Sequence, residues 1–90
     1  MIRLHGQLTC LTDEDAAAVR LHLPEHMRLT RAEPGNLSFE VTPTIDPMVW
    51  QVDELFTDRA AFEAHQSRNR ASTWFAATNA VRREFTIIEE

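Results

Sequence analysis

Alternation of apolar and polar residues marks several stretches of the chain as strands. In residues 2–11, the apolar side chains of Ile2, Leu4 and Leu8 fall on one face, and polar side chains fall on the other. A two-residue period with one apolar face is typical of a half-buried strand. The same reasoning predicts three further strands, in residues 37–42, 48–56 and 81–89.

Helical spacing of apolar residues fills the first gap between strands. Thr12 or Asp13 is suited to cap a helix there, and the acidic residues that follow suit its positive end. Pro24 predicts a break or kink, because proline has no N–H to donate within a helix. We expect Pro24 to open a second helical piece that runs to about Ala32.

A second helical region follows the third predicted strand. Thr57 or Asp58 is suited to cap it, and its apolar side ends at His65. The polar residues 66–70 predict a loosening of this helix, and residues 71–77 predict a short third one.

The predicted order of strands and helices is βαββαβ over a single domain, residues 1–90. This order favours an α+β fold of the ferredoxin-like type, in which helices cover one face of an antiparallel four-stranded sheet. Leucine and isoleucine occur on both faces of the third and fourth strands, so the second face of the sheet also needs a cover. We expect that cover to be a second copy of the chain, in a homodimer with the sheets face to face.

Composition removes several classes of function. The formal net charge of −5 disfavours a nucleic-acid surface, which needs a positive footprint. Cys10 is the single cysteine, so an intramolecular disulfide and a cysteine-based metal cluster are excluded. No apolar run is long enough to span a membrane, and the first residues lack the apolar core of a signal peptide. These observations predict a cytoplasmic protein with no nucleic-acid or membrane partner.

The middle of the chain carries a set of short motifs. They are Glu33-Pro34-Gly35-Asn36-Leu37, Phe39-Glu40-Val41, Glu54-Leu55-Phe56, Asp58 and Ala64-His65. Together they resemble the antibiotic biosynthesis monooxygenase domain family, and its quinol monooxygenase-like branch in particular. The resemblance implies a dimeric α+β barrel built from ferredoxin-like protomers. It also implies oxygenation of a quinol-like or phenolic small molecule by dioxygen, without metal, flavin or any other cofactor.

The chain departs from the family at two places, the first of which is Asn36, where the family often has a cysteine or another residue. Residues 66–70 replace the segment in which many relatives carry a second histidine. The haem-degrading branch uses an asparagine in the first strand, which is missing here, and its tryptophan and histidine positions hold His65 and Phe75. The resemblance therefore disfavours haem degradation.

His65 and Glu54 are the candidate catalytic residues. A histidine on the apolar side of a helix can take a proton from a phenol near neutral pH, and the resulting anion reacts with oxygen. The alternative is a structural histidine at a helix end. Glu54 shares a strand face with Trp50 and Phe56, so its carboxyl is either paired with a partner such as Arg59, Arg82 or His65, or has a raised pKa.

Four residues are candidates for substrate binding. His5 and Gln7 line a pocket if the polar face of the first strand meets the helices, whereas Trp50 and Trp74 can stack on a planar substrate or belong to the core. His22 and His26 have metal-chelating spacing, but Pro24 lies between them, so we interpret both as surface residues and expect no metal site. An isomerase of the same fold and a non-catalytic small-molecule-binding dimer remain alternatives to the monooxygenase.

Overall fold

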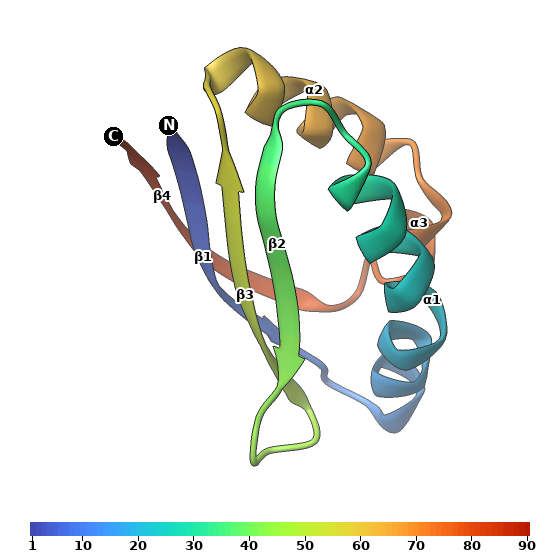
Figure 1. Cartoon of the computed structure of the whole chain (residues 1–90). Coiled ribbons are helices and arrows are strands. Elements are labelled where there is room, and N and C mark those ends of the chain that lie inside the picture. Colours follow the sequence, from blue (N-terminus) through green and yellow to red (C-terminus); the bar gives the residue numbers. More distant parts are fainter.

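The computed structural model describes residues 1–90 and contains four strands and three helices (Figure 1). In chain order they are β1 (Ile2–Thr9), α1 (Asp13–Arg31), β2 (Asn36–Pro43), β3 (Val49–Phe56), α2 (Arg59–Arg70), α3 (Thr73–Ala77) and β4 (Arg82–Glu89). The predicted βαββαβ order is confirmed, and the short third helix predicted in residues 71–77 is α3.

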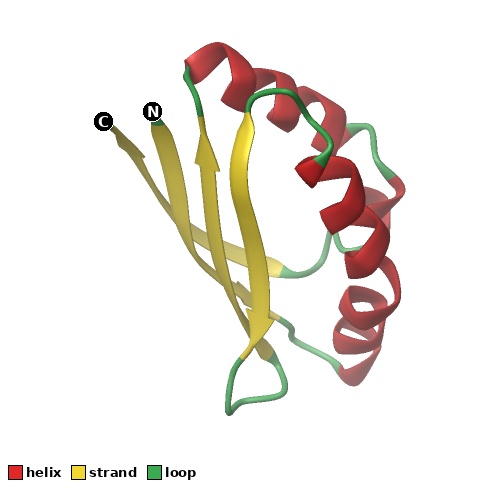
Figure 2. Ribbon diagram, in the orientation of Figure 1, coloured by secondary structure: helices red, strands yellow, loops and turns green.

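The strands form one sheet in the order β2-β3-β1-β4, and every neighbouring pair is antiparallel. Figure 2 shows that all three helices lie on the same side of this sheet. The ferredoxin-like α+β fold is therefore confirmed. None of the helices combines the length and apolar character that crossing a membrane requires.

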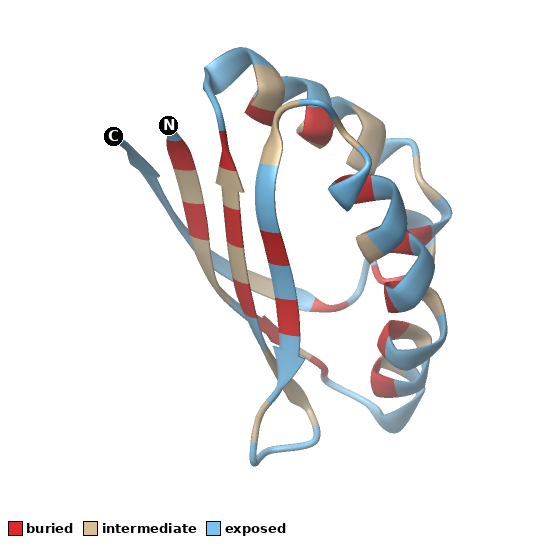
Figure 3. Ribbon diagram, in the orientation of Figure 1, coloured by how far each residue is buried: buried red, intermediate tan, exposed pale blue.

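The core lies between the sheet and the helices, and the buried bands on the strands follow the predicted two-residue period (Figure 3). Ile2, Leu4 and Leu8 of β1 point toward the helices, as do Val52 and Phe56 of β3. The remaining core residues are Cys10, Ala16, Val19, Leu23, Phe39, Val41, Phe62, Trp74 and Val81.

Side chains cap the helices where the sequence predicts. The Thr12 hydroxyl accepts a hydrogen bond from the Asp15 N–H at 3.1 Å, and the Asp58 carboxylate accepts one from the Ala61 N–H at 2.8 Å. Each cap satisfies a backbone donor that the first turn of a helix leaves unpaired.

Two local predictions are wrong. Helix α1 runs without interruption from Asp13 to Arg31, with Pro24 inside it. Pro24 is exposed, so water can reach the carbonyl that loses its partner. Helix α2 likewise continues through residues 66–70 to Arg70, and its last turn carries basic side chains that suit the negative end of a helix.

Gly6 allows β1 and β4 to approach closely. A Cβ atom at this position would lie 2.0 Å from the backbone oxygen of Glu84, so only glycine fits. Gly6 pairs with Phe85, and Leu8 pairs with Arg83. The close approach of the two strands therefore positions the side chains of Arg83 and Phe85 on the helix side of the sheet.

Candidate functional site

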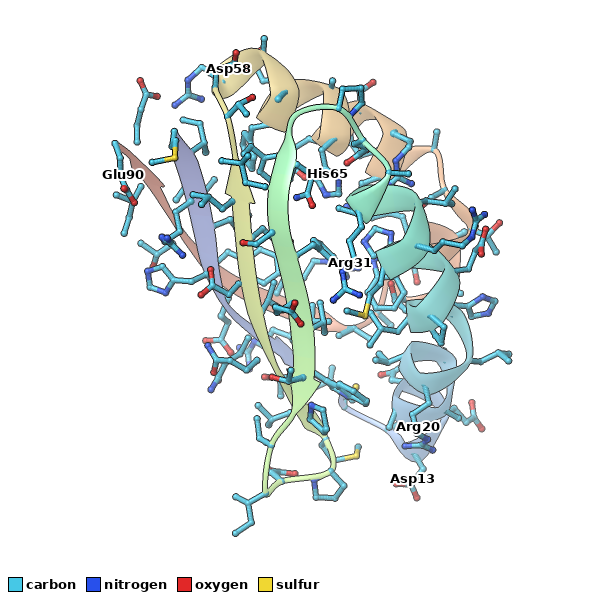
Figure 4. The ribbon with its side chains drawn as sticks, viewed as in Figure 1. Asp13, Arg20, Arg31, Asp58, His65 and Glu90 are labelled. Atoms are coloured by element: carbon cyan, nitrogen blue, oxygen red, sulfur yellow. The ribbon has the colours of Figure 1, made fainter.

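His65 lies between the helices and the sheet (Figure 4), and ionisable side chains contact both of its ring nitrogens. The side chain of His65 projects from α2, and the residue is 2 % exposed. Its Nδ1 lies 2.8 Å from Oε1 of Glu33, and its Nε2 lies 3.7 Å from Oε1 of Glu54. The distance to Glu33 is that of a hydrogen bond. The distance to Glu54 is too long for one, but a small movement of either side chain would bring the two atoms within hydrogen-bonding range. Burial lowers the pKa of His65, and the hydrogen bond to Glu33 opposes this effect.

Glu33 follows the end of α1 and is fixed by an arginine. The Arg68 Nε donates to Oε2 of Glu33 at 2.6 Å, and Nη2 of Arg68 donates to the Thr30 hydroxyl at 2.9 Å. A carboxylate held by a guanidinium remains an acceptor. Glu33 therefore favours a hydrogen on Nδ1 of His65, which leaves the Nε2 lone pair facing Glu54.

Glu54 is a buried carboxyl without a hydrogen-bond partner on Oε1. Burial raises its pKa to about 8, and the nearby charges of Glu33 and Asp53 act in the same direction. The arginine partners considered from the sequence are not used, because Arg59 pairs with Glu89 instead. Such a carboxyl holds a proton at neutral pH and becomes a base in mildly alkaline solution.

His26 belongs to this site, and its interpretation as a surface residue is wrong. The side chain is 4 % exposed and stacks on Trp74, with ring centroids 4.8 Å apart and planes at 7°. Burial lowers its pKa to about 3, and the nearby charges of His65, Arg68 and Arg83 act in the same direction, so the ring is neutral. Its Nδ1 has no hydrogen-bond partner.

Two cavities meet at the stacked pair of His26 and Trp74. The outer cavity has a volume of about 500 Å³ and lies between α1 and the region that joins α2 to α3. It is lined by His22, Glu25, His26, Leu29, Arg68, Ala71, Ser72, Thr73 and Trp74. The inner cavity, of about 30 Å³, is large enough for a single water or dioxygen molecule.

The inner cavity combines apolar walls with polar groups that lack partners. Glu54, Asn69 and His26 contribute such groups, and Phe39 and Phe85 contribute aromatic walls. Arg83 also lines this cavity, and it donates hydrogen bonds to Thr78. The site therefore presents a buried acid–base group next to a space that accepts a small molecule.

Comparison with known proteins identifies the family of this chain. The family model described as "antibiotic biosynthesis monooxygenase" matches residues 1–77. The chain belongs to this family. No match was found among curated proteins.

Solved structures of similar fold cover almost the whole chain. A putative antibiotic biosynthesis monooxygenase from Deinococcus radiodurans is 26 % identical, with a TM-score of 0.77 over 100 % of this chain and 92 % of that one. A protein of the same description from Nitrosomonas europaea is 17 % identical, with a TM-score of 0.79 over 98 % and 94 %. SnoaB, a cofactor-independent oxygenase from Streptomyces nogalater, is 13 % identical, with a TM-score of 0.81 over 99 % and 91 %. The last two show a shared fold.

The candidate residues of this family member separate into two groups. Glu54, His65 and Trp74 lie together on the helix side of the sheet. Trp50 is on the same side, but it packs against the core and lines neither cavity.

His5 and Gln7 do not line the helix-side cavities. They point to the opposite face of the sheet, because Leu4 and Leu8 of the same strand occupy the helix side. Their prediction as pocket groups under the helices is therefore wrong.

Sequence reasoning missed Glu33, His26, Asn69, Arg68 and Arg83. His26 could have been found, because Val19, Leu23, His26 and Thr30 recur at helical spacing and are all buried in α1. The arginines and Asn69 carry no such signal, since their neighbours in the sequence are polar and exposed in part.

Proposed function

We propose that this chain is a monooxygenase that inserts one atom of dioxygen into a phenolic or quinol-like small molecule, without a metal or flavin. The observation that carries the proposal is the buried Glu54 carboxyl, which lines a cavity with an unpartnered oxygen and a pKa raised by burial to about 8. Family membership and the printed description of SnoaB as a cofactor-independent oxygenase support this reaction type.

The chemistry needs one base. The Glu54 carboxylate takes the proton of the phenolic hydroxyl, and Nε2 of His65 lies 3.7 Å behind it, where it can accept a hydrogen bond from the acid that forms. The electron-rich phenolate gives electrons to dioxygen, and a carbon–oxygen bond forms at a ring carbon. One oxygen atom stays on that carbon as a carbonyl. The other leaves as water with the ring hydrogen and the phenolic proton, so a phenol and dioxygen give a quinone and water.

The outer cavity is the proposed place of entry. Its volume lies within the range of about 300–1,000 Å³ that is usual for small-molecule sites. A planar ring that displaces Trp74 from its stack on His26 would reach Glu54. Trp74 is carried by α3, which has five residues and is therefore a small unit to move.

Oxygen uptake with a panel of quinols and phenols, in the presence of a chelator, tests this function. We expect uptake by the unchanged protein and a fall of about 100-fold or more in Glu54→Gln, which keeps the side-chain size but removes the base. His65→Ala is expected to lower the rate as well. Glu63→Gln, an exposed position on α2, is the matched control and should keep the full rate.

Two results would contradict the proposal. Uptake that is equal in Glu54→Gln and in the unchanged protein would remove Glu54 from the chemistry. Exchange of substrate protons without oxygen consumption would instead favour an isomerase of the same fold.

We further propose that the functional unit is a homodimer, with the open faces of two sheets in contact. This face carries the apolar side chains Val49, Leu55 and Ile88 among polar ones, and Ile88 is 41 % exposed. Packing against a second copy would remove them from water. Light scattering at micromolar concentration should give twice the chain mass, and Leu55→Arg should give the monomer mass. A monomeric mass for the unchanged protein would refute the dimer.

A further inference from the structure

Glu33 is the outermost carboxylate of a continuous chain that ends in the inner cavity. Arg68, at the wall of the outer cavity, holds Oε2 of Glu33, while Oε1 of Glu33 meets His65. His65 in turn faces Glu54. Of the four connected side chains Arg68, Glu33, His65 and Glu54, only Glu54 lines the inner cavity. Glu33 therefore cannot touch a molecule in that cavity, yet its contacts determine the state of the group that can.

We propose that Glu33 and His65 form a pair that orients the Glu54 carboxylic acid while it holds the substrate proton, with Glu33 as the positioning residue. This inference rests on the proposed function, in which Glu54 takes the substrate proton. It assigns to Glu33 the role of fixing which nitrogen of His65 is free to accept a hydrogen bond from the Glu54 carboxylic acid.

The proton transfer balances in two steps. Glu54 first receives the phenolic proton and becomes a neutral carboxylic acid. Nε2 of His65 accepts a hydrogen bond from this acid across a distance that closes from 3.7 Å, and the acid later returns the proton to the oxygen that leaves as water, which regenerates the carboxylate. The neutral imidazole keeps its hydrogen bond from Nδ1 to Glu33 at 2.8 Å, so its Nε2 lone pair stays turned to Glu54.

The groups around His65 are consistent with such a role. On α1, the neutral ring of His26 lies 6.0 Å away, and the apolar rings of Phe39 on β2 and Phe56 on β3 cover the imidazole. The ionisable groups that face His65 are Glu33, Glu54 and Arg68, and Arg68 is paired with Glu33. Glu33 is therefore the carboxylate that determines the tautomer.

Nuclear magnetic resonance of the resting protein with ¹⁵N-labelled histidine tests the proposal without any substrate. At pH 9, where Glu54 is ionised, we expect the His65 ring to be neutral with its hydrogen on Nδ1. A hydrogen on Nε2 in the unchanged protein would overturn the proposal, because that nitrogen could then accept nothing from Glu54.

Glu33→Gln should reverse the tautomer. Arg68 will keep the amide oxygen, so the amide NH₂ turns toward Nδ1 of His65 and moves the ring hydrogen to Nε2. The matched control is Glu25→Gln, since Glu25 is a second glutamate paired with an arginine, Arg28, and lies on the outer cavity. The control should leave the His65 signals unchanged. An unchanged tautomer in folded Glu33→Gln would contradict the inference.

A kinetic measurement separates positioning from a merely structural role. In Glu33→Gln we expect kcat to fall by about 10- to 100-fold with KM little changed, and the alkaline rise of the rate to move to lower pH. A change in KM alone would indicate a structural role. If no quinol is oxidised but the tautomer reverses as expected, the positioning of His65 by Glu33 stands and the proposed reaction fails.

Discussion

Glu54→Gln is expected to stabilise the fold at alkaline pH, by an amount that grows from pH 4.5 to pH 8. The folded protein holds the Glu54 proton up to about pH 8, whereas the unfolded chain releases it near 4.5. Between these values the folded state binds one proton more than the unfolded state, so stability falls as pH rises. Glutamine does not titrate, and the variant escapes this loss.

The size of the effect follows from the same two pKa values. Each pKa unit corresponds to about 1.4 kcal/mol, so the interval from 4.5 to about 8 gives a difference on the order of 4 kcal/mol. Urea unfolding at pH 5, 6.5 and 8.5 measures it. The gain of Glu54→Gln over the unchanged protein should be small at pH 5 and largest at pH 8.5.

A matched exchange at the surface separates this effect from a general loss of charge. Glu63→Gln removes a carboxylate from the exposed side of α2 and should give a gain close to zero at all three pH values. If the Glu54→Gln gain were the same at pH 5 and pH 8.5, the carboxyl would not be held protonated by burial.

A loss of stability with rising pH is also the cost of keeping a base in the core. Burial of a carboxyl is unfavourable when it ionises, and the proposed reaction requires the ionised form. Nε2 of His65 lies 3.7 Å from Oε1 of Glu54, close to the proton of the neutral carboxyl. The other ring nitrogen of His65 is hydrogen-bonded to Glu33. The same arrangement thus supplies a hydrogen-bond acceptor for the protonated carboxyl.

The fold could be predicted from the sequence because β1, β2 and β3 each bury alternate residues on one face. Ile2, Leu4 and Leu8 fix the orientation of β1, and the same period holds in β3. Pro24 misled the prediction, since an exposed proline inside a long amphipathic helix leaves only one carbonyl to be satisfied by water.

The candidate site could be predicted only in part. His65 and Glu54 stand out in the sequence as polar residues at apolar positions, and the structure brings them together. Glu33 and Arg68 are 35 residues apart and meet only because α2 packs beside the end of α1, which no local pattern records. The choice between the two faces of β1 also depended on the helices, so His5 and Gln7 could not be placed beforehand.

The buried His26 lowers the stability of the fold at acid pH, whereas the buried Glu54 lowers it at alkaline pH. His26 is neutral in the folded protein down to about pH 3, while the unfolded chain protonates it near 6.5. The unfolded state therefore binds more protons between pH 3 and 6.5, and stability falls as pH falls. Between 4.5 and 6.5 the slopes from His26 and Glu54 cancel, so these two residues predict a plateau there.

His26→Phe is expected to remove the acid-side loss. Phenylalanine keeps a ring to stack on Trp74 and removes the unpartnered Nδ1, which alone is worth about 1 kcal/mol. At pH 5 the absence of the titrating group adds about 2 kcal/mol, from 1.5 pH units at about 1.4 kcal/mol each. Urea unfolding at pH 5 and pH 7.5 should show a larger gain at pH 5.

Leu29→Phe distinguishes the loss of a titrating group from the gain of an apolar ring. Leu29 lines the same outer cavity and carries no ionisable group, so any effect of the added ring there should be equal at both pH values. A gain of His26→Phe that is likewise equal at both would show that the folded protein admits a charged His26. Because His26 stacks on Trp74 at the junction of the two cavities, that result would also mean that the junction is open to water.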